Sequence, residues 1–87
     1  MRYHFGVVSA EKALAAMRDN PKGVRYADLH RVCVHYFGEP RQNATSHATF
    51  KMPWAGDPRV NIQNAKGQAK AYQVRQVLEA IDKLEGL

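Results

Sequence analysis

Apolar residues first recur at helical spacing near the start of the chain. Between Ser9 and Asn20 they fall three and four positions apart, at Ala10, Ala13, Leu14 and Met17, and this spacing predicts an amphipathic helix. Ser9 is a good N-cap, and Glu11 places a negative charge in the first turn, where it suits the helix dipole. Because Pro21 disfavours a helical conformation in the residue before it, we expect the helix to end at Asp19–Asn20.

Two further segments show the same helical period. From about Arg25 to Phe37 an apolar face is formed by Tyr26, Leu29, Cys33 and Tyr36. Gly38 is a natural stop for that helix. From about Ala71 to Leu84 a second apolar stripe is formed by Val74, Val77, Leu78, Ile81 and Leu84. Both patterns predict helices with one buried face.

Between these two helices the period changes to two. Residues 46–52 alternate, with Phe50 and Met52 on the apolar side and His47 and Lys51 on the other. Such alternation is typical of a strand with one buried face. The pattern therefore predicts that His47 lies on an open face of a sheet.

The neighbouring segments complete the predicted sheet. Residues 59–63 alternate again, with Val60 and Ile62 inward and Arg59, Asn61 and Gln63 outward. Residues 53–58 are typical of a turn. A short strand around Glu39–Gln42 would add a third, and Asn64–Lys70 looks like a polar loop. The order of elements predicts an α+β fold in which helices cover one face of a three-stranded antiparallel sheet and the other face is open.

Length and composition indicate one small domain. The chain has 87 residues and a single cysteine, Cys33, so it forms no internal disulfide, which suits a reducing compartment. No segment approaches the roughly 18–20 apolar residues that span a membrane, and Met1–Val8 has no features of a signal peptide. We therefore expect a cytoplasmic protein that does not bind a membrane.

The net charge of +5 is concentrated in the middle of the chain. Residues 40–78 hold six basic residues and one acidic residue, so this segment carries the whole excess. A local positive field attracts polyanions, and nucleic acid first among them. An acidic protein partner would be attracted equally, and a charge excess of this size is also typical of an ordinary solvated surface.

His47 is the candidate for chemistry. Imidazole exchanges protons near neutral pH and serves as a general base or acid. RNA supplies its own nucleophile, the 2′-OH, so a histidine near cations is sufficient for slow cleavage without metal or other cofactor. Lys51 lies on the same predicted face, and Arg41 and Arg59 lie on neighbouring strands. The alternative is that an exposed histidine on a strand has no chemical role.

Other residues suggest less. Cys33 and His35 match no standard zinc spacing, so we expect no metal site. The remaining histidines, His4 and His30, are expected in a terminal segment and on a helix. Trp54, in the predicted turn, is suited to stacking on a base, to packing against a partner or to capping the edge of the sheet.

The order of these motifs resembles the HicA family of toxin–antitoxin ribonucleases. The resemblance rests on the helix "RYADLHRVCVHYFG", a hairpin turn that closes on Ser46–His47, the strands "ATFKMPW" and "RVNIQ", the loop "AKGQAK" and the helix "YQVRQVLEAI". It covers residues 24 to about 85. Residues 24–87 would then be the HicA-like toxin domain, and residues 1–23 an additional N-terminal extension with one helix.

The resemblance implies a fold like that of a double-stranded-RNA-binding domain and ribosome-independent cleavage of mRNA. The essential histidine of the family falls on His47. An antitoxin of the HicB type would cover the site, and any DNA binding would come through that antitoxin. The family usually has glycine immediately before the Ser-His pair, whereas this chain has Thr45, so turn geometry or activity would differ here.

These observations predict a metal-independent mRNA endoribonuclease with His47 as its catalytic residue. Ser46 would orient the histidine or bind phosphate, while the phosphate-binding cations would be Arg41, Lys51, Arg59, Lys66 and Lys70. No second proton-transfer group is evident. The alternatives are a non-catalytic RNA-binding module of the same fold and a protein-interaction domain with a basic face.

Overall fold

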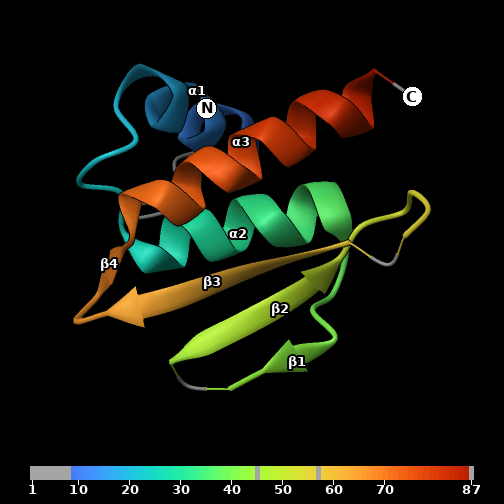
Figure 1. Ribbon diagram of the computed structural model, residues 1–87. Helices are drawn as coiled ribbons and strands as arrows, with labels where there is room; N and C mark the ends of the chain where they lie inside the picture. The colour runs from blue at the N-terminus through green and yellow to red at the C-terminus, as the bar shows by residue number, and fades with distance from the viewer. Residues whose placement is uncertain (1–8, 45, 57, 87) are drawn as a thin grey trace, which may run out of the picture.

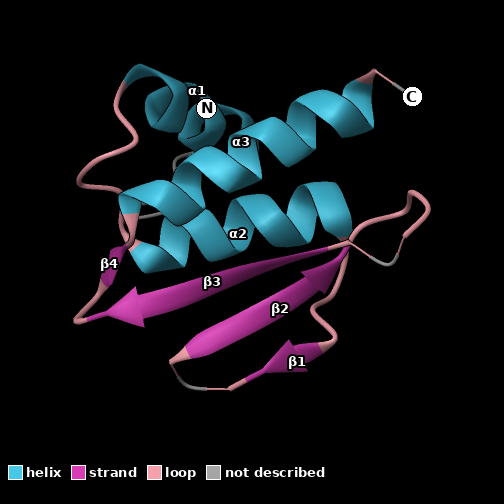
Figure 2. Ribbon diagram, in the orientation of Figure 1, coloured by secondary structure: helices cyan, strands magenta, loops and turns pink. Residues whose placement is uncertain are grey.

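A computed structural model of the chain describes residues 9–44, 46–56 and 58–86. Its elements follow in the order α1 (Ala10–Asp19), α2 (Tyr26–Phe37), β1 (Gln42–Asn43), β2 (His47–Lys51), β3 (Arg59–Ala65), β4 (Gln68–Ala69) and α3 (Ala71–Glu85). The strands form one antiparallel sheet in the order β1-β2-β3-β4. All three helices lie on one side of this sheet, as Figure 1 and Figure 2 show. The predicted α+β architecture, with one covered and one open face, is confirmed.

The helices begin and end close to the predicted residues. The Ser9 side chain accepts a hydrogen bond from the Lys12 backbone N–H at 3.2 Å, as an N-cap does. Gly38 ends α2 with φ 88°, a left-handed conformation that costs glycine little. The local signals in these segments agree with the packing of their apolar faces, so the helix boundaries follow from the sequence.

The two long strands carry the alternation predicted for them. Strand β2 pairs with β3 so that His47 lies opposite Gln63 and Lys51 opposite Arg59. Ala48, Phe50 and Ile62 are fully buried beneath the helices. Because side chains alternate along a strand, the residues between these buried ones point to the open face, where Thr49 is nevertheless only 8% exposed.

Two predictions about the sheet were wrong. The first strand spans Gln42–Asn43 rather than Glu39–Gln42, so Pro40 precedes it. The sheet also has four strands rather than three, because residues 64–70 form a hairpin and not a loop. Lys66 and Gly67 both adopt positive φ, 55° and 86°, as the tight two-residue turn of a hairpin requires.

Helix α1 belongs to the same core as the rest of the chain. Leu14 and Met17 are buried in one cluster with residues of α2, α3 and the sheet. Arg18 on α1 also bonds Asp82 on α3, with 2.7 Å between Nη2 and Oδ1. The helix of the predicted N-terminal extension is thus docked on the domain, while residues 1–8 and the expected place of His4 lie outside the described residues.

Within the described part of the chain, no helix is both long and apolar enough to cross a membrane.

Candidate nucleic-acid interface

Strand β2 carries candidate side chains at both of its ends. Its central residues Ala48 and Phe50 are anchored in the core, and its end residues His47 and Lys51 are exposed. The strand is held on both sides by β1 and β3. The two candidate side chains therefore project from a rigid support.

Three predicted phosphate-binding residues gather at one end of β2. Arg41, Lys51 and Arg59 line one hollow of about 340 Å³ together with Gln42 and Thr49. We call this hollow the cationic site. The backbone N–H of Arg41 donates to the Thr49 carbonyl at 2.8 Å, which holds the chain before β1 against β2.

The pairing of Lys51 with Arg59 is electrostatically unfavourable in itself. The two residues are direct cross-strand partners, and like charges in that position destabilise a sheet. The strand register therefore brings two cations side by side at this end of β2, and positively charged side chains are the usual partners of a phosphate group.

His47 lies in a different hollow. It lines a space of about 390 Å³ with Asn61, Gln63, Tyr72 and Gln73, which we call the imidazole site. Asn61 and Gln63 come from β3, and Tyr72 and Gln73 come from the first turn of α3. Apart from the histidine, none of these five side chains can carry a positive charge.

One buried amide organises the imidazole site. Gln73 is only 4% exposed, and its Oε1 accepts a hydrogen bond from the Gln63 backbone N–H at 2.8 Å. Its Nε2 donates to Gln63 Oε1 at 3.2 Å and lies 3.4 Å from the Tyr72 hydroxyl oxygen. Since the backbone N–H can only donate, it determines which end of the Gln73 amide is the acceptor.

The two sites are separated by one hydrogen-bonded pair. Thr49 Oγ1 donates to Asn61 Oδ1 at 2.7 Å, and Thr49 lines the cationic site while Asn61 lines the imidazole site. His47 and Lys51 are four residues apart on one strand, which corresponds to about 13 Å. The structure thus places both groups on one face but does not bring the cations to the imidazole.

The remaining predicted residues lie at the imidazole end of the sheet. The Ser46 carbonyl accepts from the Asn64 N–H at 2.8 Å, and its side chain is exposed just before β2. Lys66 lies in the β3–β4 turn and Lys70 immediately before α3, both exposed. Thr45, where the family usually has glycine, lies outside the described residues.

Nothing in the described ranges 9–44, 46–56 and 58–86 hydrogen-bonds the His47 imidazole through a side chain. A catalytic histidine is commonly oriented by a third group. A bound substrate would have to supply that orientation here.

The other chemically suggestive residues have structural roles. His30 packs its ring against Phe50 and bonds Asn43 Oδ1 at 3.2 Å. Trp54 packs against the core, with Lys83 Nζ 4.8 Å from its ring centroid. Burial raises the pKa of the Cys33 thiol, which disfavours the thiolate that nucleophiles and metal ligands need. Among the described residues no three potential metal ligands of the His, Cys, Asp and Glu types lie together.

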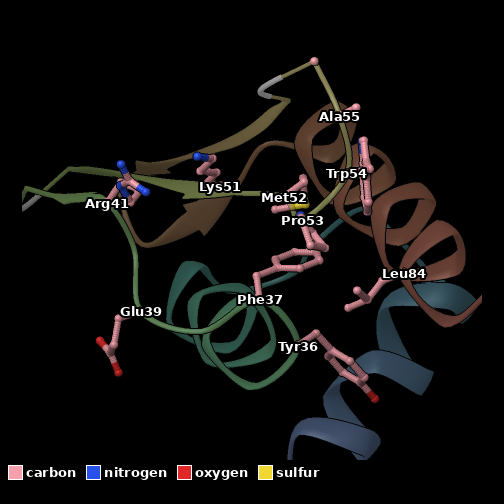
Figure 3. Close-up of a pocket in the computed structure, with 11 residues that line it drawn as sticks. Tyr36, Phe37, Glu39, Arg41, Lys51, Met52, Pro53, Trp54, Ala55 and Leu84 are labelled. Atoms are coloured by element: carbon pink, nitrogen blue, oxygen red, sulfur yellow. The ribbon is translucent and has the colours of Figure 1, made fainter. Parts of the chain in front are cut away.

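A further hollow adjoins the cationic site. It has a volume of about 950 Å³ and lies where β2 runs into the loop after it. Figure 3 shows Arg41 and Lys51 at one side of this hollow and the apolar side chains of Tyr36, Trp54 and Leu84 at the other. The two cations therefore border a second, more apolar surface.

Sequence reasoning missed Tyr72 and Gln73 as parts of the site. Alternation directs Asn61 and Gln63 to the open face, but the helical period of residues 71–84 predicts only the buried apolar stripe of that helix. The available signal was Tyr72 itself, a large aromatic side chain that lies off that stripe and is 54% exposed. The sequence does not show which end of the sheet Tyr72 lies beside, because that depends on where α3 packs.

Comparison of the chain with models of protein families, with curated proteins and with solved structures finds no match.

Proposed function

We propose that this protein is an endoribonuclease of the HicA toxin type that cleaves mRNA in the cytoplasm with His47 as its catalytic residue. The observation that carries the proposal is the position of His47. It is exposed at one end of an anchored strand, on the same open face as three clustered cations. RNA is a substrate that needs only a proton-transfer group and cations.

The proposed reaction is an internal transesterification. A ribose 2′-OH loses its proton, and its oxygen attacks the adjacent phosphorus. The bond from phosphorus to the 5′-oxygen breaks and that oxygen takes up a proton, so the products are a 2′,3′-cyclic phosphate and a 5′-hydroxyl. His47 serves as the base, with solvent water protonating the leaving oxygen, or as the acid, with solvent water taking the 2′-OH proton. No metal takes part.

The neighbouring polar and basic residues would bind the RNA strand and would not take part in the reaction. Arg41, Lys51 and Arg59 would hold a phosphate some distance from the cleaved bond, because they line the separate cationic site. Ser46, Lys66 and Lys70 lie nearer the His47 end and would bind the adjoining phosphates.

The order of the elements supports a fold like that of a double-stranded-RNA-binding domain. Helix α2, the antiparallel strands and helix α3 follow one another as the resemblance leads us to expect. Strand β4 is an addition, and it joins the sheet to the start of α3. An antitoxin of the HicB type would neutralise the protein by covering the open face, and DNA would be bound only through that partner.

The test is substitution of His47 by alanine in the purified protein. We expect cleavage of a single-stranded RNA to fall by about 10²–10⁴-fold, the usual contribution of a general acid or base, while RNA affinity stays nearly unchanged. His35→Ala is the matched control, because His35 is also exposed but lies on α2. Growth arrest on expression should follow cleavage. Cleavage that survives in His47→Ala would overturn the assignment.

One observation favours a second candidate, a non-catalytic RNA-binding module. No side chain in the described ranges hydrogen-bonds the His47 imidazole, and binding alone does not need such orientation. RNA that stays intact after long incubation, bound with an affinity that falls steeply as salt rises, would establish this alternative. A complete lack of RNA affinity at low salt would exclude both candidates.

A further inference from the structure

Tyr72 presents an aromatic ring beside the candidate histidine. It is a large hydrophobic side chain with 54% of its surface exposed, and it lines the imidazole site with His47. A single exposed aromatic residue is unremarkable on its own. Tyr72 differs because its neighbour Gln73 is buried and hydrogen-bonds both the Tyr72 hydroxyl and Gln63.

The Gln73 hydrogen bonds determine how the neighbouring groups are oriented. Because Gln73 Oε1 accepts from the Gln63 backbone, its Nε2 is the donor toward Gln63 Oε1 and the Tyr72 oxygen. The amide nitrogen of Gln63 is then the end of that side chain left to face a ligand. Similarly, Asn61 Oδ1 accepts from Thr49, so the donor end of Asn61 is left to face the hollow.

These groups match the chemistry of a nucleobase. Single-stranded RNA is recognised when its unpaired bases stack on aromatic rings and hydrogen-bond to side chains along their edges. Tyr72 supplies a ring, and Asn61 and Gln63 supply amide donors for carbonyl oxygens or ring nitrogens of a base. The absence of Lys and Arg from the five lining residues makes a phosphate the less suitable occupant.

We propose that the imidazole site is a nucleobase-binding subsite in which Tyr72 stacks on an unpaired base of single-stranded RNA. The inference rests on the proposed function, since it names the part of the RNA that this site receives. Base binding beside His47 and phosphate binding beside Lys51, about 13 Å away along β2, would place the RNA strand across the open face. A duplex could not donate a base without unpairing it, so single-stranded RNA is the expected substrate.

The experiment compares two oligomers of equal length that cannot be cleaved. One is single-stranded 2′-O-methyl RNA, and the other is its abasic counterpart, a ribose-phosphate chain without bases. Fluorescence anisotropy gives the affinity of each for the unaltered protein, for Tyr72→Phe and for Tyr72→Leu. Phe keeps the ring and loses the hydroxyl, whereas Leu loses both.

We expect the unaltered protein to prefer the oligomer with bases by about 5- to 150-fold, the range for stacking of one base. Tyr72→Phe should keep this preference and Tyr72→Leu should lose most of it. The control is Arg41→Gln with Lys51→Gln, which should weaken binding of both oligomers equally. Thermal unfolding checks that each variant is folded.

Two results would overturn the subsite alone. An undiminished preference in Tyr72→Leu would show that the ring does not stack on a base. An equal loss in Tyr72→Phe would show that the hydroxyl, not the ring, is responsible. If the base preference behaves as expected but unmodified RNA is never cleaved, the subsite is supported and the ribonuclease proposal fails. Absence of RNA binding by the unaltered protein would overturn both.

Discussion

The two hollows on the open face differ in the chemistry of their side chains, although β2 and β3 contribute to both. The cationic site gathers Arg41, Lys51 and Arg59, while the imidazole site consists of one histidine, one tyrosine and three amides. The three clustered cations are thus at one end of β2, and the groups suited to base contacts and proton transfer are at the other, where Lys66 and Lys70 lie nearby but do not line the hollow. The difference indicates that binding of a polyanion and its cleavage depend on different residues of this face.

A ligand that uses both sites must be extended. On β2, His47 of the imidazole site and Lys51 of the cationic site are about 13 Å apart, and the Thr49–Asn61 hydrogen bond lies between the two hollows. A small anion would fill the cationic site alone. An extended nucleic-acid strand would contact both, and variants that remove one site at a time should therefore affect different measurements.

The largest effect should come from removing the support that both sites share. The Phe50 side chain projects from β2 into the core, where it is fully buried, and its ring packs near those of Phe37 and His30. Phe50→Ala should lower the free energy of unfolding by about 3–5 kcal/mol, as a cavity in a core of this kind does. Urea unfolding measures this change.

The same variant should impair both sites together. RNA affinity and cleavage should fall in proportion to the fraction of unfolded protein, whereas Tyr72→Phe, which alters an exposed side chain, should leave stability nearly unchanged. If Phe50→Ala abolished cleavage in fully folded protein, the core would be influencing the imidazole site specifically, and the two sites would not share β2 as a passive support.

A smaller effect should follow from neutralising the cationic site alone. Arg41→Gln with Lys51→Gln removes two charges from it. We expect RNA affinity at low salt to fall about tenfold, or roughly 0.7 kcal/mol for each exposed contact. The slope of log affinity against log salt should shrink in magnitude by about 1.4 for a single strand. Cleavage at saturating RNA should change little.

The matched control is Lys12→Gln with Lys22→Gln. It removes the same charge from exposed positions on and after α1, in the helical layer. An equal loss of affinity in the control would mean that net charge alone drives binding and that the cationic site has no particular part in it. A loss of cleavage at saturating RNA would mean that the cations act at the reaction itself.

Local pattern predicted most of the frame that supports these sites. Alternation in β2 placed His47 and Lys51 on the open face because Phe50 and its inward neighbours need the core. Strand β4 was missed because two residues show no period. Its signal in the sequence was Gly67, because glycine readily adopts the positive φ that a two-residue hairpin turn requires; the positive φ of Lys66 is seen in the structure alone.

The composition of the imidazole site could not be predicted in the same way. Tyr72 and Gln73 meet His47 only because β4 is short and leaves the Gln63 N–H for the Gln73 side chain. That contact joins residues from two elements and depends on where α3 docks. The division of the predicted site into two hollows likewise follows from strand register, which places Arg59 opposite Lys51 and Gln63 opposite His47.

The smallest effect concerns the helical side, which should be independent of both hollows. The hydrogen bond from the Arg18 guanidinium lowers the pKa of Asp82. A carboxylate with a lowered pKa in the folded state stabilises the fold above its unfolded pKa of about 4 and loses that contribution as pH falls through the folded value. Asp82→Asn should therefore destabilise the protein slightly at pH 7, and this difference in stability from the unaltered protein should disappear in acid.

Urea unfolding at both pH values measures the difference, with Asp19→Asn on α1 as the charge-matched control. A difference that grew in acid would contradict the assignment, and any change in RNA affinity would show that the helical layer and the open face are coupled.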